Sequence, residues 1–513
     1  MSIICIFCQG AEVASLLQER NKLDMESVEQ IDPSENIEPE VVKKKVVKGI
    51  GILTARTFFI QAISFGANVL LTVFLEPGEY GVFFLVSALI NFLAYFGDIG
   101  FAASLIQKKE KLTQIELRTI FTAQQILVAT IFVSVLLLTP VIENVYKLDQ
   151  KSIYLLWAVA FSLVLSSLKT IPTVLLERQL EFNKWVIPQI VETIIFNVVV
   201  VFLAWRGFGV ASFTTGVLLR GFSGLLITYM VQPWLPGISF SISAFKSVLK
   251  FGVPYQANAL LAMVKDDGMT LLLAGILGQN GIGLLGWAQK WAYAPLRFFM
   301  DQVIKVTFPA FSRLQDEKQE LSNAASRTIL FICLLTFPSI MILILIIPSL
   351  TLIIPKYSKW IPALTALILI SITSAFAAVT TPLTNTLNAI GKISITFKLM
   401  LMWTFLTWVF VPGLAMLYGL DGAAFGFTLV GLSSFVAIFI ASKYIKVDYL
   451  QSVGKPLIGA MLTGVALQSI RYVLPASIIQ VVLMVVGGII LYSAVIFILE
   501  PKIIDMARSI FKR

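Results

Sequence analysis

FGVPYQANALLAMVKDDGMTLLLAGILG (residues 251–278) places three charged side chains inside one of the most apolar regions of the chain. Any helix over this stretch puts Lys265, Asp266 and Asp267 far from both of its apolar ends. Each unpaired charge at the centre of a bilayer costs about 2.5–3.5 kcal/mol. A membrane helix that carries three such charges is therefore expected to place them against water, a ligand or each other.

The composition is that of a polytopic α-helical membrane protein. Of the 513 residues, 58% are apolar and 13% are charged, and the mean hydropathy is +0.88, whereas soluble domains are about a quarter charged. The chain has no histidine, which excludes histidine-based catalysis and histidine metal ligands. Cys5, Cys8 and Cys333 have no spacing typical of a ligand set. We therefore expect no bound metal and no cofactor other than a coupling ion.

The apolar segments predict fourteen membrane spans, each long enough to cross a bilayer with about 20 residues. Several contain Pro or Gly, which membrane helices tolerate when neighbouring helices satisfy the freed backbone groups. The predicted spans are 50–75, 80–104, 117–142, 152–176, 185–205, 208–231, 249–277, 281–304, 326–349, 360–388, 394–417, 420–442, 456–474 and 478–499.

Residues 1–47 differ from the rest of the chain. Between Glu12 and Glu40 there are nine acidic residues, against Arg20 and Lys22 as the basic ones. Such a polar, charged segment cannot bury enough apolar surface to fold. We predict a disordered, acidic, cytoplasmic tail.

The loop charges predict the orientation in the membrane, because cytoplasmic loops carry the excess of Lys and Arg. With a cytoplasmic N-terminus, 25 Lys and Arg residues from Lys43 onward fall in cytoplasmic loops and termini and six in outer loops. We expect a multi-pass protein of the cytoplasmic (inner) membrane with both termini in the cytoplasm. The net charge of +10 then belongs mostly to the cytoplasmic face, where it attracts anionic lipid, and implies no nucleic acid.

The chain contains an internal repeat. Residues 48–84 align with 250–286 at a constant offset of 202, with seven identities that include Gly81 with Gly283. Span 1 falls on span 7, so both halves have six spans and enter the membrane in the same direction. Two-lobed transporters with a site between the lobes have this parallel repeat. The predicted units are an N-lobe (48–245), a C-lobe (246–445), and spans 13 and 14 with a basic cytoplasmic tail (446–513).

Two segments carry a resemblance to a known family. They are LEPGEYGVFFLVSALINFLAYFGDIGFAASLIQKKEKLT (75–113) and LGQNGIGLLGWAQKWAYAPLRFFMDQVIKVTFPAFSRLQDEKQEL (277–321). Over roughly 48–445 the chain resembles Wzx-type polysaccharide flippases, the O-antigen and exopolysaccharide exporters of the multidrug/oligosaccharidyl-lipid/polysaccharide (MOP) superfamily. The resemblance implies a V-shaped pair of six-helix lobes that moves a polyprenyl-diphosphate-linked oligosaccharide outward by alternating access. It also implies membrane lipids and the polysaccharide polymerase or export machinery as partners.

The resemblance leaves the coupling ion open. Some relatives hold sodium with one acid in span 11 and another in span 7. Span 11 of this chain (394–417) has no carboxylate, so both Na+ and H+ remain alternatives here.

Charged side chains inside the predicted spans are the candidate site. The candidates for substrate binding in the cavity are Arg56, Arg220, Lys265, Lys290 and Arg297. The candidates for a coupling ion or a charge pair are Asp98, Asp266, Asp267 and Asp301. At about 100° per residue, Lys290, Arg297 and Asp301 share one face of span 8.

Arg56, Lys290 and Arg297 come from helices that open the two halves of the repeat, so we expect them to converge on the cavity between the lobes. Lys169 and Glu192 lie near span ends and are expected to snorkel toward the interface. Lys265 has a structural alternative, a pair with Asp266 or Asp267 that holds helices together.

Two other functions remain as alternatives. A multidrug extruder of the same superfamily would favour a mainly acidic site, but the embedded charges are six basic and five acidic. A membrane enzyme that transfers glycans is less favoured, because the outer loops are short and no D-x-D motif occurs. We therefore predict a transporter and not an enzyme.

Overall fold

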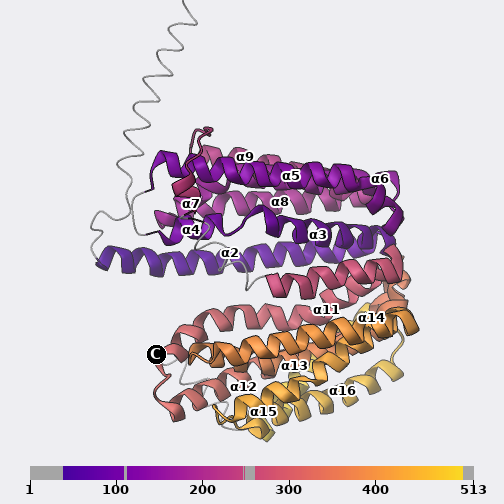
Figure 1. Ribbon diagram of the computed structural model, residues 1–513. Helices are drawn as coiled ribbons and strands as arrows, with labels where there is room; N and C mark the ends of the chain where they lie inside the picture. The colour runs from indigo at the N-terminus through magenta and orange to yellow at the C-terminus, as the bar shows by residue number, and fades with distance from the viewer. Residues whose placement is uncertain (1–38, 109–111, 247, 249–259, 501–513) are drawn as a thin grey trace, which may run out of the picture.

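The computed structural model describes residues 39–108, 112–246, 248 and 260–500 (Figure 1), and within these ranges it is helical with no strand. The all-α class predicted from composition is confirmed. Most of the predicted tail (1–47) and the end of the chain (501–513) lie outside the described residues. The exception is 39–47, because helix α2 already begins at Pro39 and not near residue 50.

The first half of the chain forms one bundle of helices. Within it α8 packs on α2 and α9, and α6 packs on α5 and α9. We call these helices the first bundle: α2 (Pro39–Phe74), α3 (Pro77–Gly97), α4 (Phe101–Gln107), α5 (Gln114–Tyr146), α6 (Gln150–Leu168), α7 (Thr170–Arg178), α8 (Phe182–Trp205) and α9 (Val210–Val231).

The second half forms a second bundle, which lies below the first in Figure 1. Its elements are η1 (Val264–Gly268), α11 (Met269–Arg313), α12 (Lys318–Ile353), η2 (Tyr357–Ala363), α13 (Leu364–Ala389), α14 (Ile393–Leu432) and α15 (Ser434–Ser442). The chain then continues through η3 (Leu450–Gly454), α16 (Lys455–Val473) and α17 (Ile478–Leu499), which pack on α12. These bundles contain the helices of the two predicted lobes, while the lobe boundaries themselves remain predictions.

Eleven helices of the described residues are long and apolar enough to cross a membrane. The count differs from fourteen in two places. Residues 393–442 count once, although Gly419 (φ 60°) interrupts the helix. The charged helix α11 is not among the eleven, although Gly278 (φ 70°) divides it into two helices. The count of fourteen therefore remains a prediction.

The bundles meet where α3 crosses α11, at the end of the molecule where α2 ends (right in Figure 1). Glycines allow the close approach. A Cβ on Gly81 would lie 1.9 Å from the carbonyl oxygen of Gln279, and one on Gly283 would lie 1.8 Å from that of Pro77. The offset of 202 carries Pro77 onto Gln279 and Gly81 onto Gly283. Equivalent residues thus exchange equivalent contacts, as at a two-fold axis, which confirms the internal repeat.

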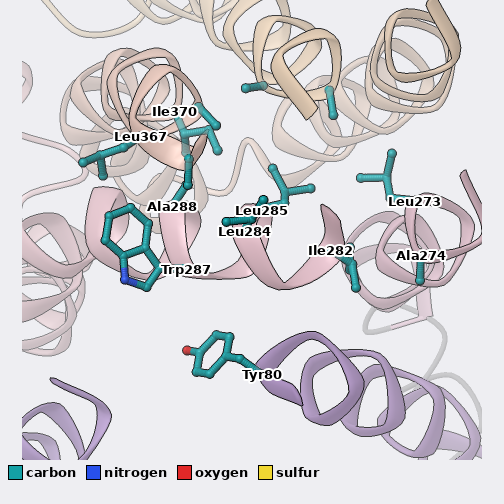
Figure 2. Close-up of a cluster of buried hydrophobic side chains, with 14 of the residues drawn as sticks. Tyr80, Leu273, Ala274, Ile282, Leu284, Leu285, Trp287, Ala288, Leu367 and Ile370 are labelled. Atoms are coloured by element: carbon teal, nitrogen blue, oxygen red, sulfur yellow. The ribbon is translucent and has the colours of Figure 1, made fainter. Parts of the chain in front are cut away.

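Aromatic side chains of both bundles seal this crossing. Figure 2 shows Tyr80 of α3 beside the turn of α11 that carries Trp287. The rings of Trp287 and Trp360 stack with centroids 5.2 Å apart, and Tyr80 packs edge-on against Trp360 at 5.9 Å. All three side chains are buried. We call the α3–α11 crossing together with these aromatic residues the junction.

Candidate functional site

One face of α11 changes from buried to exposed along its length. Gly283 and Gly286 are buried against α3, whereas Lys290, Arg297 and Asp301 are exposed. At about 100° per residue, the other four positions lie within roughly 60° of Gly283. The face of α11 that packs on α3 at the junction is therefore exposed from Lys290 onward. We call Lys290, Arg297 and Asp301 the charged row.

Lys290 is exposed on a helix that lies within the predicted membrane spans. No hydrogen bond or ion pair joins Lys290, Arg297 or Asp301 to another described side chain. Because an unpaired charge in hydrocarbon is costly, we expect these side chains to face water and not lipid.

Helix α2 shows the same change on the opposite wall. Thr72 and Asn68 are buried at the junction, and Phe65 and Phe58, on the same face, are half exposed further along. Phe65 packs edge-on against Trp291 of α11 with centroids 5.6 Å apart. Contact between α2 and α11 beyond the junction is thus made by long aromatic side chains, which leave room between the helix backbones.

The charged row is not required by the symmetry of the fold. The offset of 202 relates Lys290 to Ala88 and Arg297 to Tyr95 on α3. The equivalent helix crosses the same junction without these charges. Because charges inside a membrane are costly, their presence on only one of two equivalent helices favours a functional role.

The Lys265 cluster lies directly before α11 in the chain. Lys265 Nζ is 3.0 Å from Asp266 Oδ1, and the Asp266 side chain is 69% exposed. Both belong to the π-turn η1, where Gly268 faces the ring of Trp408. The pair predicted from the sequence is therefore present.

Asp267 is half-buried next to this pair. Within the described residues there is no group of three or more acidic, Cys or His side chains that could hold a metal ion. Tyr255 and Asn258, which helical periodicity places on the face of Lys265 and Asp266, lie outside the described residues. The candidate ion site therefore rests on the two adjacent carboxylates of η1.

The structure does not bring Arg56 together with Lys290 and Arg297. The Arg56 guanidinium donates a hydrogen bond to Gln189 Oε1 and lies over the Trp185 ring, 5.7 Å from its centroid. Both partners belong to α8 of the same bundle. Position 56 lies on the far side of α2 from Thr72, so the side chain points into the first bundle.

Arg220 belongs to a second cluster, around Glu192 of α8. Its Nε is 3.7 Å from Glu192 Oε2, and its guanidinium lies over Phe196. Glu192 also accepts a hydrogen bond from Lys169 Nζ. The expectation that Lys169 and Glu192 snorkel is wrong, because Glu192 is buried and pairs with Lys169 at the break between α6 and α7.

Sequence reasoning missed Glu192 as a central group. The sequence does show Glu192 as a single acid in an apolar part of its helix. It does not show the partners of Glu192, because these lie on other helices. Gly224 of α9 makes room for it, since a Cβ there would lie 1.9 Å from Glu192 Oε1.

Asp98 has a local structural role. It follows the last residue of α3, and its Oδ1 accepts a hydrogen bond from the backbone N–H of Phe101 at 2.8 Å. A carboxylate at this position caps the next helix, α4, by accepting a free N–H of its first turn. The structure thus places Asp98 at a helix start, apart from the charged row.

The chain matches the family model described as polysaccharide biosynthesis protein over residues 70–365, more than half of its length. The chain belongs to this family. It is 23% identical over 411 residues to the lipopolysaccharide biosynthesis protein WzxC of Escherichia coli K12, covering 78% of this chain and 82% of WzxC. It is 21% identical to the succinoglycan biosynthesis transport protein ExoT of Rhizobium meliloti 1021, covering 92% of this chain and 97% of ExoT.

The fold of this polysaccharide biosynthesis protein is similar to that of solved transporters. The lipid II flippase MurJ in an inward closed conformation matches with a TM-score of 0.70 at 15% identity, over 88% of this chain and 99% of MurJ. An inward-facing multidrug resistance MATE family transporter of the MOP superfamily matches with a TM-score of 0.55, also at 15% identity, over 75% and 95%. The protein therefore has the MOP transporter fold.

Proposed function

We propose that this protein is a flippase that exports polyprenyl-diphosphate-linked oligosaccharide units across the cytoplasmic membrane by alternating access. The observation that carries the proposal is the pair of exposed cations, Lys290 and Arg297, on the same face of α11 that packs on α3 at the junction. Family membership and the relatives WzxC and ExoT support the same activity.

The physical problem is to move an anionic, hydroxyl-rich head group through hydrocarbon. A buried polar group without a hydrogen-bond partner costs about 2–7 kcal/mol, and an oligosaccharide carries many such groups. A hydrated cavity keeps these groups satisfied. Arg297 can grip phosphate oxygens with its planar fork, while Lys290 acts as a point charge. The lipid tail stays in the bilayer.

The first bundle adds positive charge. Three cations, Arg56, Lys169 and Arg220, surround α8, and Glu192 is the acid that pairs with two of them. These charges are held within the first bundle, so the preference for an anionic substrate over a cationic drug rests on Lys290 and Arg297.

A coupling ion is proposed at η1. The half-buried Asp267 and the adjacent, exposed Asp266 would supply the carboxylate oxygens that accept a coupling proton. The same carboxylates could ligate Na+ only together with backbone or water oxygens.

The export activity is tested by complementation. In a bacterium whose own polysaccharide flippase is deleted, the wild-type gene is expected to restore surface polysaccharide, measured by immunoblot or staining. Resistance to cationic drugs is the second readout. Drug resistance without polysaccharide would replace the proposed flippase by the multidrug extruder.

The orientation is tested by reporter fusions. With both termini cytoplasmic, α2 crosses outward and the junction lies on the outer side of the membrane. Green fluorescent protein fused at the C-terminus or inserted between α4 and α5 (108–113) is expected to fluoresce, and alkaline phosphatase at the same sites to be inactive. An active phosphatase at the C-terminus would overturn both the orientation and the predicted span count.

A further inference from the structure

Lys359 of η2 contacts the first bundle although it belongs to the second. Its Nζ donates to the carbonyl oxygen of Val73 at 3.0 Å and lies 3.7 Å from Glu76 Oε1. The Lys359 side chain is 11% exposed. The Lys169–Glu192 and Lys265–Asp266 pairs each stay within one bundle, whereas this ammonium is held entirely by groups across the junction.

The neighbours of Lys359 are held in the same way. The indole N–H of Trp360 donates to the carbonyl oxygen of Thr72 at 2.8 Å, and the hydroxyls of Tyr357 and Thr72 are 3.1 Å apart. Alternating access requires the bundles to separate at the junction. That separation removes all of these contacts together and leaves the ammonium without its partners, at the end of the molecule.

The position of Lys359 extends the charged row. Trp360, the next residue, stacks on Trp287 of α11, and Lys290 follows Trp287 by three residues, or about 4.5 Å along the helix. Along α11, Lys290 is therefore closer to Lys359 than Arg297 is, and the three cations follow one another toward the junction. A diphosphate that moves along this face toward the junction meets Lys359 next.

We propose that Lys359 is a second binding position for the substrate diphosphate, masked in this state and exposed when the junction opens. The proposal rests on the proposed flippase function. In the present state the Lys359 ammonium is bound by the carbonyl oxygen of Val73 and the carboxylate of Glu76. In the open state the phosphate oxygens take their place. The substrate then binds the open state more tightly than the closed one, and its binding stabilises the open junction.

A simple latch between the bundles is the competing explanation, and the two differ in symmetry. A latch made by the ion pair with Glu76 is lost when either charge is removed. A latch made by the hydrogen bond to Val73 is lost only with Lys359, and its loss would appear as increased opening of the junction. The Glu76 side chain is 62% exposed, so its pair with Lys359 contributes little in water. If Lys359 binds phosphate, removing Glu76 is harmless and removing Lys359 is not.

The experiment compares Lys359→Gln, Lys359→Arg and Glu76→Gln in the full-length protein, in a flippase-deleted host with protein level in the membrane checked. Lys356→Gln is the matched control, an exposed lysine three residues earlier. We expect Lys359→Gln to lower export at least about tenfold, as the loss of a charged hydrogen bond does. Lys359→Arg, Glu76→Gln and Lys356→Gln should export near the wild-type level.

A second readout separates binding from gating. Thr72 is buried at the junction, where its hydroxyl meets that of Tyr357 of the other bundle. Thr72→Cys, in a chain without Cys5, Cys8 and Cys333, therefore reports opening through a membrane-impermeant maleimide. Lost export with unchanged labelling supports the proposal. Normal export by Lys359→Gln, equal loss in Glu76→Gln, or loss accompanied by increased labelling each overturns it. If the wild-type gene itself restores no polysaccharide, the proposed flippase function fails first and this inference fails with it.

Discussion

Reversing the charge of Lys290 or Arg297 is expected to abolish export, and to do so more completely than removing the side chain. Lys290→Ala and Arg297→Ala each lose a charged hydrogen bond worth roughly 1.5–3 kcal/mol, or about one to two orders of magnitude in affinity. Lys290→Glu and Arg297→Glu add repulsion of the diphosphate to that loss. Arg297→Lys should be intermediate, because an ammonium lacks the planar fork. The measurement is surface polysaccharide in a flippase-deleted host.

Arg313→Glu provides the matched control. Arg313 is exposed on the same helix, about 120° around from Gly283, and its reversal changes the net charge equally. Export near the wild-type level is expected, at equal protein in the membrane. If the Ala and Glu variants at Lys290 and Arg297 had equal activity, these positions would not meet an anion during transport.

Gly283→Ala is expected to disrupt the junction. The added Cβ would lie 1.8 Å from the carbonyl oxygen of Pro77, so α3 and α11 must move apart, at a cost of about 1–3 kcal/mol or more. We expect a lower melting temperature in detergent, and loss of export, because the closed junction can no longer form.

Gly275→Ala is the same substitution on the same helix. No atom lies within 4 Å of a Cβ at Gly275, and alanine is a better helix former than glycine by roughly 0.5–1 kcal/mol. This variant should be as stable as the wild type or more so, with normal export. A Gly283→Ala protein with the stability and activity of Gly275→Ala would show that the close crossing is not needed.

The sequence allowed prediction of features that depend on local spacing. The charged row of α11 follows from helical periodicity. The repeat offset of 202 identifies Gly81 and Gly283 as equivalent, and the structure shows these two glycines at the same crossing. Most span positions follow from the length of apolar segments, because a bilayer imposes a nearly constant length on each helix.

Features that depend on partners from distant helices were not predictable. Arg56 was expected at the cavity, but Gln189 and Trp185, more than 120 residues later, draw it into the first bundle. Glu192 was assigned to the interface because nothing in its own helix shows the lysine and arginine that meet it. Its partners become visible only when α6, α8 and α9 are packed together.

Local irregularities of the backbone were also missed. The π-turn η1 contains an extra residue relative to an α-helix, which changes the direction of Lys265 and Asp266 from the one given by a regular 100° step. The breaks at Asp98 and Lys169 end two predicted spans early. These irregularities carry charged or polar groups whose hydrogen bonds compete with those of the helix.

Movement of a labelled polyprenyl-diphosphate-linked oligosaccharide across the membrane of proteoliposomes, with purified protein, tests the proposed transport most directly. A glycosidase added outside cleaves only the head groups that reach the outer leaflet. With the wild-type protein and an imposed ion gradient, cleavage is expected to continue beyond the outer-leaflet share and approach completion, while Arg297→Glu vesicles stop at that share. Cleavage by wild-type vesicles that stops at the level of protein-free vesicles would contradict the account.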